Sequence, residues 1–197
     1  MKLKHIALSL SLLACTTAGA QKHRLEHNFY ISEGIAKPYN STETLPLSLR
    51  FGYGLNCYLS DRWSVMPGIA YRGKIRWTDA LLGMGAYNFA CIDVPLLAQY
   101  HFGDPQKSGF VAELGSVLSF LTTNSEHYWW EKERKGEKIY KSFDMGLQPG
   151  VYYQVGKHWR FGVQGRIGLL NIVKQYPNRP SESYHAHDIT ATVNFHF

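Results

Sequence analysis

The sequence predicts an all-β protein: an eight-stranded antiparallel up-and-down β-barrel that spans a membrane. Three observations predict it. The last ten residues, 188–197, alternate between apolar and polar side chains, as a strand with one apolar face does. Glycine and aromatic residues are abundant (18 glycines, 14% aromatic), whereas only 18% of residues are charged. After residue 20, no apolar stretch approaches the ~18 residues that a membrane helix needs, so strands would have to cross the membrane.

Residues 1–20 are predicted to be a cleaved export signal. A basic start precedes a short apolar segment, and small residues ending at Ala20 offer a cleavage site. The barrel domain is then residues 21–197. A competing lipobox-like site would make Cys15 a lipidated N-terminus. We favour cleavage after Ala20, because one acyl chain adds little to a barrel that lipid already surrounds.

The first two strands differ in clarity. Residues 27–36 form a candidate strand whose inward side the sequence leaves open, because Glu33 shares a face with Phe29 and Ile31. Residues 47–59 form a clear strand with one long apolar face and a second face that carries Arg50 and glycines. Glycine allows strands to bend in a narrow closed barrel.

The third strand, residues 63–77, has an apolar face with Trp63 and Trp77 near its two ends. Aromatic residues at both ends of a strand are typical of the two interfaces of a membrane barrel. The fourth and fifth strands are predicted at residues 88–102 and 109–123. The inward face of the fifth strand is partly apolar, which favours a packed interior over an open channel.

The last three strands are predicted at residues 142–155, 159–169 and 188–197. The connections alternate in length along the chain. Short turns are expected at residues 60–62, 103–108 and 156–158, and longer loops at 37–44, 78–86, 124–141 and 172–183. Outer-membrane barrels have short periplasmic turns and long extracellular loops, so both termini are predicted to lie in the periplasm.

Residues 92–102, with the sequence Ile-Asp-Val-Pro-Leu-Leu-Ala-Gln-Tyr-His-Phe, resemble a strand of the PorT-type outer-membrane β-barrel domain family. The shared pattern is an acidic residue, a hydrophobic residue and Pro-Leu-Leu. That family is similar in size and layout to the eight-stranded transmembrane domain of OmpA. The likeness covers residues 21–197 as a pattern, and only residues 93–102 and the terminal Phe197 are specific. It implies a bacterial outer-membrane location and a barrel fold, with no catalytic residues.

Many predicted inward positions are charged. Because buried charges must be paired to be tolerated, we expect a charge network that fills the lumen, the interior of the barrel. Its expected members are Arg50, Arg72, Lys74, Arg76, Arg160 and Arg166 against Asp93, Glu113, Asp144 and Asp188. The excess of bases leaves a narrow anion-preferring path as an alternative.

The longest predicted loop contains Tyr128, Trp129 and Trp130 beside a run of mixed charge. Such a segment is usually a solvated hairpin. Exposed aromatic residues beside charges also suit sugars or a protein partner, so these three residues are candidates for surface recognition.

A hydrolytic site is the main enzymatic alternative. Ser183, His185 and His187 share a strand face, but the neighbouring Asp188 points to the other face. Some eight-stranded outer-membrane barrels are lipid A acyl hydrolases or acyltransferases, and the match to their motifs is poor. The two histidines alone make an incomplete metal site. We therefore expect a non-enzymatic protein with no catalytic, metal or cofactor site.

The expected partners follow from charge and location. Removing Lys2 and Lys4 from the formal charge of +6 leaves +4, a mild excess that suits anionic lipid headgroups. We find no nucleic-acid motif. The barrel-assembly machinery would read the terminal strand with Phe195 and Phe197. An extracellular ligand is possible but not identified by the sequence, and a monomer is expected.

Two alternative architectures differ from this barrel in their interior. A secreted soluble barrel with an apolar ligand would need its apolar face inward, and a small pore would need an open lumen. Cys57 and Cys91 are predicted on opposite faces of the barrel wall, so they should remain free thiols. The expected role is envelope structure or surface recognition.

Overall fold

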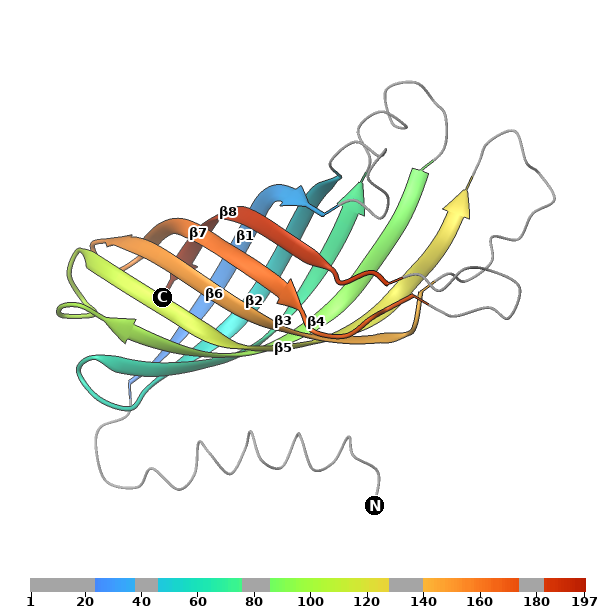
Figure 1. Ribbon diagram of the computed structural model, residues 1–197. Helices are drawn as coiled ribbons and strands as arrows, with labels where there is room; N and C mark the ends of the chain where they lie inside the picture. The colour runs from blue at the N-terminus through green and yellow to red at the C-terminus, as the bar shows by residue number, and fades with distance from the viewer. Residues whose placement is uncertain (1–23, 38–45, 76–85, 128–139, 174–182) are drawn as a thin grey trace, which may run out of the picture.

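The computed structural model describes residues 24–37, 46–75, 86–127, 140–173 and 183–197. Within them the chain forms eight strands that pair in sequence order, each antiparallel to the next, and β1 pairs with β8 to close the barrel (Figure 1). The predicted fold class is confirmed. The strands are β1 (Leu25–Ala36), β2 (Leu47–Tyr58), β3 (Trp63–Ile75), β4 (Ala86–His101), β5 (Gly109–His127), β6 (Phe143–Val155), β7 (Trp159–Gly168) and β8 (His187–His196).

The side chains alternate between the two faces of the wall as the sequence predicts. In β8, Ile189 is 53% exposed, whereas its neighbours Asp188 and Thr190 are buried in the lumen. The outward face is apolar all round the barrel; examples are Ile31, Phe51, Ile69, Leu96, Leu114, Val151, Val163 and Ile189. Lipid offers no partner to backbone groups, and a closed barrel satisfies them all within its wall.

The register resolves the inward face of β1. Glu26, Asn28 and Ser32 are buried in the lumen, and Glu33 is exposed on the outer wall with Phe29 and Ile31 as neighbours on that face. Glu33 pairs with Leu49 of β2 and Ala191 of β8, which also face outward. Glu33 is therefore a polar residue on an otherwise apolar face. It interrupts the alternation from which the inward side of this strand would have been predicted.

The chain closes on itself beside the C-terminus. The backbone N–H of His27 donates to the carbonyl of Phe197 at 3.0 Å, and the N–H of Phe197 donates back at 3.1 Å. The ring of Phe197 stacks on His27 with centroids 5.1 Å apart. The C-terminus and the three short turns lie at the same end of the barrel (Figure 1). This is the end predicted above to be periplasmic, and it is called the periplasmic end below; the opposite end is called the outer end.

The predicted boundary of the longest loop is wrong. β5 continues to His127, and its residues 124–127 pair with residues 86–89 of β4. The backbone ladder between these two strands does not depend on an apolar face, so polar residues such as Asn124 and Ser125 gave no strand signal. The hairpin of β4 and β5 thus extends further at the outer end than the sequence predicts.

A second correction concerns the loop predicted at residues 172–183. Ile172 and Val173 are buried together with Cys91, Tyr184 and Ala186. Backbone hydrogen bonds hold this segment: the N–H of Lys141 donates to Ile172 at 2.6 Å, and that of Ile172 donates to Tyr184 at 3.1 Å. These segments form an apolar cap at the outer end of the lumen, comprising Cys91, Tyr140, Ile172, Val173, Tyr184 and Ala186.

Neither Cys57 nor Cys91 is in a disulfide, as predicted. Among the described residues, no helix is long and apolar enough to cross a membrane. The predicted export signal with Cys15, the inward Arg76, the aromatic Trp77 and the candidate recognition residues 128–130 lie outside the described residues.

Candidate functional site

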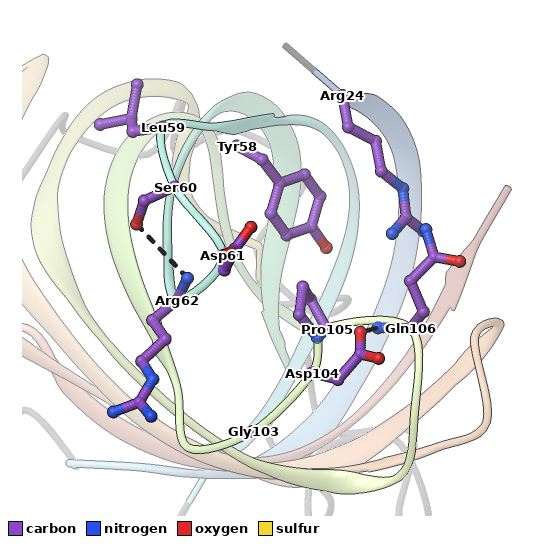
Figure 2. Close-up of a pocket in the computed structure, with 10 residues that line it drawn as sticks. All are labelled: Arg24, Tyr58, Leu59, Ser60, Asp61, Arg62, Gly103, Asp104, Pro105 and Gln106. Carbon is purple, nitrogen blue, oxygen red and sulfur yellow. Dashed lines mark hydrogen bonds between the residues drawn. The ribbon is translucent and has the colours of Figure 1, made fainter. Parts of the chain in front are cut away.

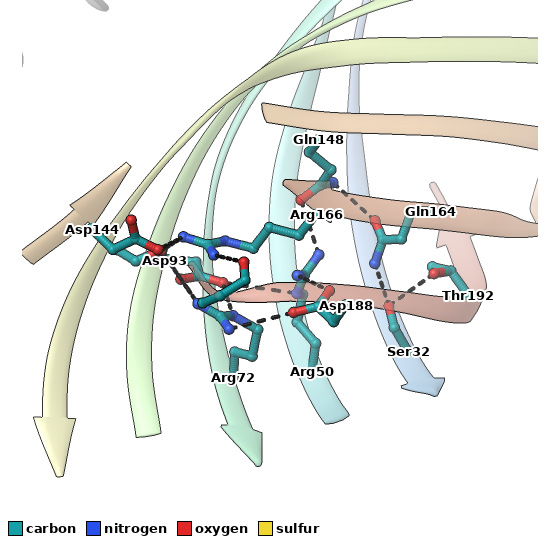
Figure 3. A network of polar contacts seen from close by, with 12 residues as sticks. Ser32, Arg50, Arg72, Asp93, Asp144, Gln148, Gln164, Arg166, Asp188 and Thr192 are labelled. Carbon is teal, nitrogen blue, oxygen red and sulfur yellow. Dashed lines mark hydrogen bonds and ion pairs between the residues drawn. The ribbon is translucent and has the colours of Figure 1, made fainter. Parts of the chain in front are cut away.

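The lumen contains a cluster of buried ion pairs towards the outer end. Asp93 of β4 accepts from Arg72 of β3 through both carboxylate oxygens, at 2.7 Å from Nε and 3.3 Å from Nη2. Asp188 of β8 lies 3.4 Å from the guanidinium groups of Arg72 and of Arg50 from β2. Four strands thus contribute to one ionic layer (Figure 3), in which each carboxylate forms ion pairs with both arginines.

A second ion pair adjoins this layer. Arg166 of β7 donates to Asp144 of β6 at 2.7 Å. The same guanidinium donates to the hydroxyl of Ser119 at 2.9 Å, and Ser119 donates to Asp93 at 2.5 Å. The layer therefore extends across the barrel from β2 to β7 (Figure 3).

A layer of uncharged partners lies next along the lumen. Glu113 of β5 accepts hydrogen bonds from Gln99 at 2.7 Å, from the Tyr152 hydroxyl at 3.1 Å and from Gln148 at 3.3 Å. Gln148 also accepts from Arg50 at 2.9 Å, which connects this layer to the ionic layer. Charge-assisted hydrogen bonds from neutral donors stabilise the buried carboxylate where an arginine does not reach it.

The periplasmic end of the lumen is polar as well. Arg160 of β7 donates to the side-chain oxygens of Gln99 at 3.1 Å and Gln154 at 3.0 Å. The hydroxyl of Tyr58 donates to Glu26 at 2.6 Å. Tyr58 is also hydrogen-bonded to Arg160, so these side chains link the periplasmic end of the lumen to its middle.

Together these contacts form one continuous chain of hydrogen bonds through the barrel. It passes from Glu26 through Tyr58, Arg160, Gln99, Glu113, Gln148, Arg50, Asp188, Arg72, Ser119 and Arg166 to Asp144. An eight-stranded barrel has an interior just wide enough for side chains to fill. The chain of contacts occupies that space.

The formal charges of the buried side chains balance among the described residues. The bases are Arg50, Arg72, Lys74, Arg160 and Arg166, and the acids are Glu26, Asp93, Glu113, Asp144 and Asp188. Glu26 was missed because the first strand was predicted to begin at residue 27, whereas β1 begins at Leu25, and because the inward face of that strand was not assigned. The neutral partners Gln99, Gln148 and Tyr152 were not singled out either, although each occupies an inward position in the predicted alternation.

The structure places the residues of the hydrolytic alternative in two environments. Ser183 Oγ lies 3.3 Å from Nε2 of His185 on the exposed side. The carboxylate of Asp188 points into the lumen and pairs with Arg50 and Arg72. His185 and His187 stack with centroids 6.3 Å apart, and no group of three or more potential metal ligands occurs in the described part of the chain.

Comparison with known proteins identifies the family. The sequence matches the family described as an outer membrane protein beta-barrel domain over residues 28–174. A search of curated proteins finds no match. The structure is similar to Neisserial surface protein A, with 16% identity, a TM-score of 0.54, and coverage of 90% of this chain and 100% of that chain.

A second similar structure is Ail, the attachment invasion locus protein of Yersinia pestis, in complex with the heparin analogue sucrose octasulfate. The identity is 9% and the TM-score 0.53, and the alignment covers 90% of this chain and 100% of that chain. At such low identity both likenesses concern the fold. The family match spans most of the chain, and the closed barrel has an apolar outer face. The chain therefore belongs to the outer membrane protein beta-barrel domain family, whose members are integral barrels of the bacterial outer membrane.

Proposed function

We propose that this protein is a non-enzymatic, monomeric outer-membrane barrel whose lumen is closed by side chains, and that it serves envelope structure or surface recognition through its extracellular loops. The observation that carries the closed lumen is the continuous chain of buried contacts from Glu26 to Asp144. The apolar cap lies beyond it at the outer end.

An ion that crossed this lumen would have to separate buried ion pairs. Removing one partner of such a pair costs about 3–5 kcal/mol, because the other charge is left without compensation. Arg72 and Asp93 are each almost fully buried and meet at 2.7 Å. The balance of formal charge among the described buried residues also favours a closed lumen over the anion-preferring path.

Planar-bilayer conductance tests the closed lumen. The purified, refolded protein should give no stepwise current. Stepwise anion-selective current from the wild-type protein would refute the proposal.

The recognition role is proposed for Tyr128, Trp129 and Trp130, whose aromatic side chains adjoin a run of charged residues in the sequence. A glycan array probed with the refolded protein tests it. We expect binding to a defined set of saccharides that is lost when the three residues are replaced by serine. Absence of binding by the wild type, or binding that the triple variant retains, would contradict a sugar-recognition role.

The non-enzymatic part of the proposal rests on the position of Asp188, whose carboxylate pairs with two lumen arginines and therefore does not orient the pair of Ser183 and His185. Incubation of the refolded protein with lipid A, followed by mass spectrometry, should show neither loss nor gain of an acyl chain. A change in acylation that Ser183→Ala abolishes would establish the enzymatic alternative.

Two further parts of the proposal concern the export signal and the narrower family. Cleavage of the export signal after Ala20 would give a mature protein that starts at Gln21, and mass spectrometry of the mature N-terminus distinguishes this from a lipidated Cys15. The resemblance of residues 92–102 to the PorT-type family supports a place for this chain in that narrower group.

A further inference from the structure

The periplasmic end of the barrel contains a cavity of about 860 Å³. Its walls are Arg24, Tyr58 and the two turns at residues 59–62 and 103–106. Figure 2 shows the side chains of Arg24 and Tyr58 projecting towards the turn that carries Asp104 and Gln106. The volume lies within the range of about 300–1,000 Å³ that small-molecule sites occupy.

Polar contacts hold the cavity wall in place. The guanidinium of Arg24 donates to the side-chain oxygen of Gln106 and pairs with Glu26. The backbone N–H of Gln106 donates to Asp104 at 2.9 Å, and this hydrogen bond lowers the pKa of the Asp104 carboxyl. The ring of Tyr58 lies 5.4 Å below the Arg24 guanidinium. Arg24 is therefore held in a fixed position on the cavity wall as one partner of an ion pair.

A second cation lies directly behind the wall. Arg160 is 1% exposed, and its hydrogen-bond partners are the neutral side chains of Gln99, Gln154 and Tyr58. Two of these partners belong to the wall or contact it: Tyr58 lines the cavity, and Gln154 donates to the carbonyl of Pro105 at 2.5 Å. Arg50, Arg72 and Arg166 each pair with a carboxylate, whereas Arg160 has no ion pair within the described residues.

Several buried polar atoms near Arg160 lack a protein partner among the described residues. They are Nε of Arg160, Nδ1 of His101 and Nε2 of His196, and each of these residues is at most 2% exposed. The ring of His101 lies 5.4 Å from that of Tyr58, so it adjoins the cavity wall. Buried polar groups in native proteins almost always bind protein, water or a ligand. These atoms indicate a hydrated, polar region behind the cavity.

We propose that this cavity is a binding site for a small oxyanion, bearing a carboxylate or phosphate group, which enters from the periplasm. A planar guanidinium matches both groups, and the bound anion would supply Arg160 with the counter-charge that its neutral partners do not. Arg24 binds the anion at the mouth of the cavity. When the anion reaches the interior, it replaces Gln154 or Tyr58 as a hydrogen-bond partner of Arg160. The layer around Glu113 closes the lumen on the outer side of Arg160, so the site opens only towards the periplasmic end. This inference goes beyond the closed-lumen function and is compatible with it.

Isothermal titration calorimetry on the full-length refolded protein in a zwitterionic detergent tests the proposal. Inorganic phosphate and succinate are titrated separately at constant ionic strength set with chloride. We expect saturable binding of at least one of them, and the better ligand identifies the preferred group. Binding should weaken at least tenfold in Arg160→Gln and in Arg24→Gln. Lys157→Gln is the matched control, because Lys157 is exposed on the β6–β7 turn at the same end and does not line the cavity.

Heat-modifiable migration confirms that each variant folds. If Arg160→Gln fails to fold, Arg24→Gln decides alone, since Arg24 precedes β1 and lies at the mouth. Absence of saturable binding to both anions overturns the proposal. Undiminished binding in the folded arginine variants, or an equal loss in Lys157→Gln, overturns it as well, because the binding would then reside elsewhere or reflect overall charge.

Discussion

Substitution of Asp93 by asparagine is the sharpest test of the ionic layer. Asp93 accepts from Arg72 at 2.7 and 3.3 Å and from Ser119 at 2.5 Å, and it lies 3.8 Å from Arg50. Asparagine keeps the size of the side chain but removes its charge. Loss of one partner of a buried ion pair costs about 3–5 kcal/mol. Because Asp188 remains 3.4 Å from both arginines, we expect about 3 kcal/mol, roughly a hundredfold in the unfolding equilibrium.

Urea titration of the barrel in lipid vesicles measures this change through tryptophan fluorescence, since Trp63 and Trp159 both lie on the outer face. The matched control is Asp104→Asn, which removes an exposed carboxylate on a periplasmic turn and should leave the midpoint unchanged. The double variant Arg72→Met, Asp93→Leu should be more stable than Asp93→Asn, because it leaves no unpaired charge and the pair of Arg50 and Asp188 persists. If Asp93→Asn unfolds at the same urea concentration as Asp104→Asn, the ionic layer does not stabilise the barrel.

Three further predictions concern the wall and the cap. Gly34→Ala should sharply reduce the folded fraction on a heat-modifiability gel, because the added Cβ would lie 2.0 Å from the carbonyl oxygen of Ile189 on the adjacent strand; Gly109→Ala, with nothing within 4 Å, should fold normally, and equal yields would contradict the close approach. Phe197→Ala should slow insertion into vesicles, since Phe197 stacks on His27 and Phe29 where the barrel closes. Phe102→Ala removes another exposed aromatic side chain at the periplasmic end and should insert at the wild-type rate. Matching insertion rates for the two variants would count against a special role for Phe197. In a Cys57→Ser background, Cys91 should resist maleimide until the barrel unfolds, and Tyr184→Ala should speed its labelling by opening the apolar cap; rapid labelling of the unaltered cap would show that it is not closed.

Alternation with period two was sufficient to predict most of the wall. In β2 and β8 the lipid-facing side must be apolar, so the sequence carries the orientation of each strand directly. β1 was ambiguous because Glu33 lies on the apolar face. It is three residues from the end of β1 at Ala36, which places it about 10 Å along the strand from the outer end, close to the polar headgroups.

The sequence could not predict which inward charges meet. Alternation assigns Arg50 and Asp188 to the lumen, but they are 138 residues apart, and only the closure of β1 on β8 brings them within 3.4 Å. The same limit applies to Glu113, whose partners are neutral and come from β4 and β6. The positions of these side chains along the barrel axis depend on the register of all eight strands, which the sequence of one strand does not encode.

The outer end was the least predictable region for a related reason. β5 extends to His127 by backbone pairing, and Ile172 is buried by contacts with residues from other loops and strands. Neither feature has a local apolar pattern of the kind that marks a strand. The apolar residues of the cap are separated by polar neighbours, and their common environment becomes visible only when the barrel is closed.

The central claim is that apolar side chains face lipid and polar side chains face the lumen. Nitroxide labels at two adjacent β7 positions, Val163→Cys and Gln164→Cys, in a protein with Cys57 and Cys91 replaced by serine, test it most directly in lipid vesicles. Val163 is 50% exposed on the outer wall and Gln164 is 2% exposed in the lumen. We predict that dissolved oxygen, which concentrates in lipid, relaxes the label at 163 strongly and the label at 164 weakly. Strong relaxation by oxygen at 164, with a label at 163 reached only by a water-soluble nickel chelate, would contradict the account.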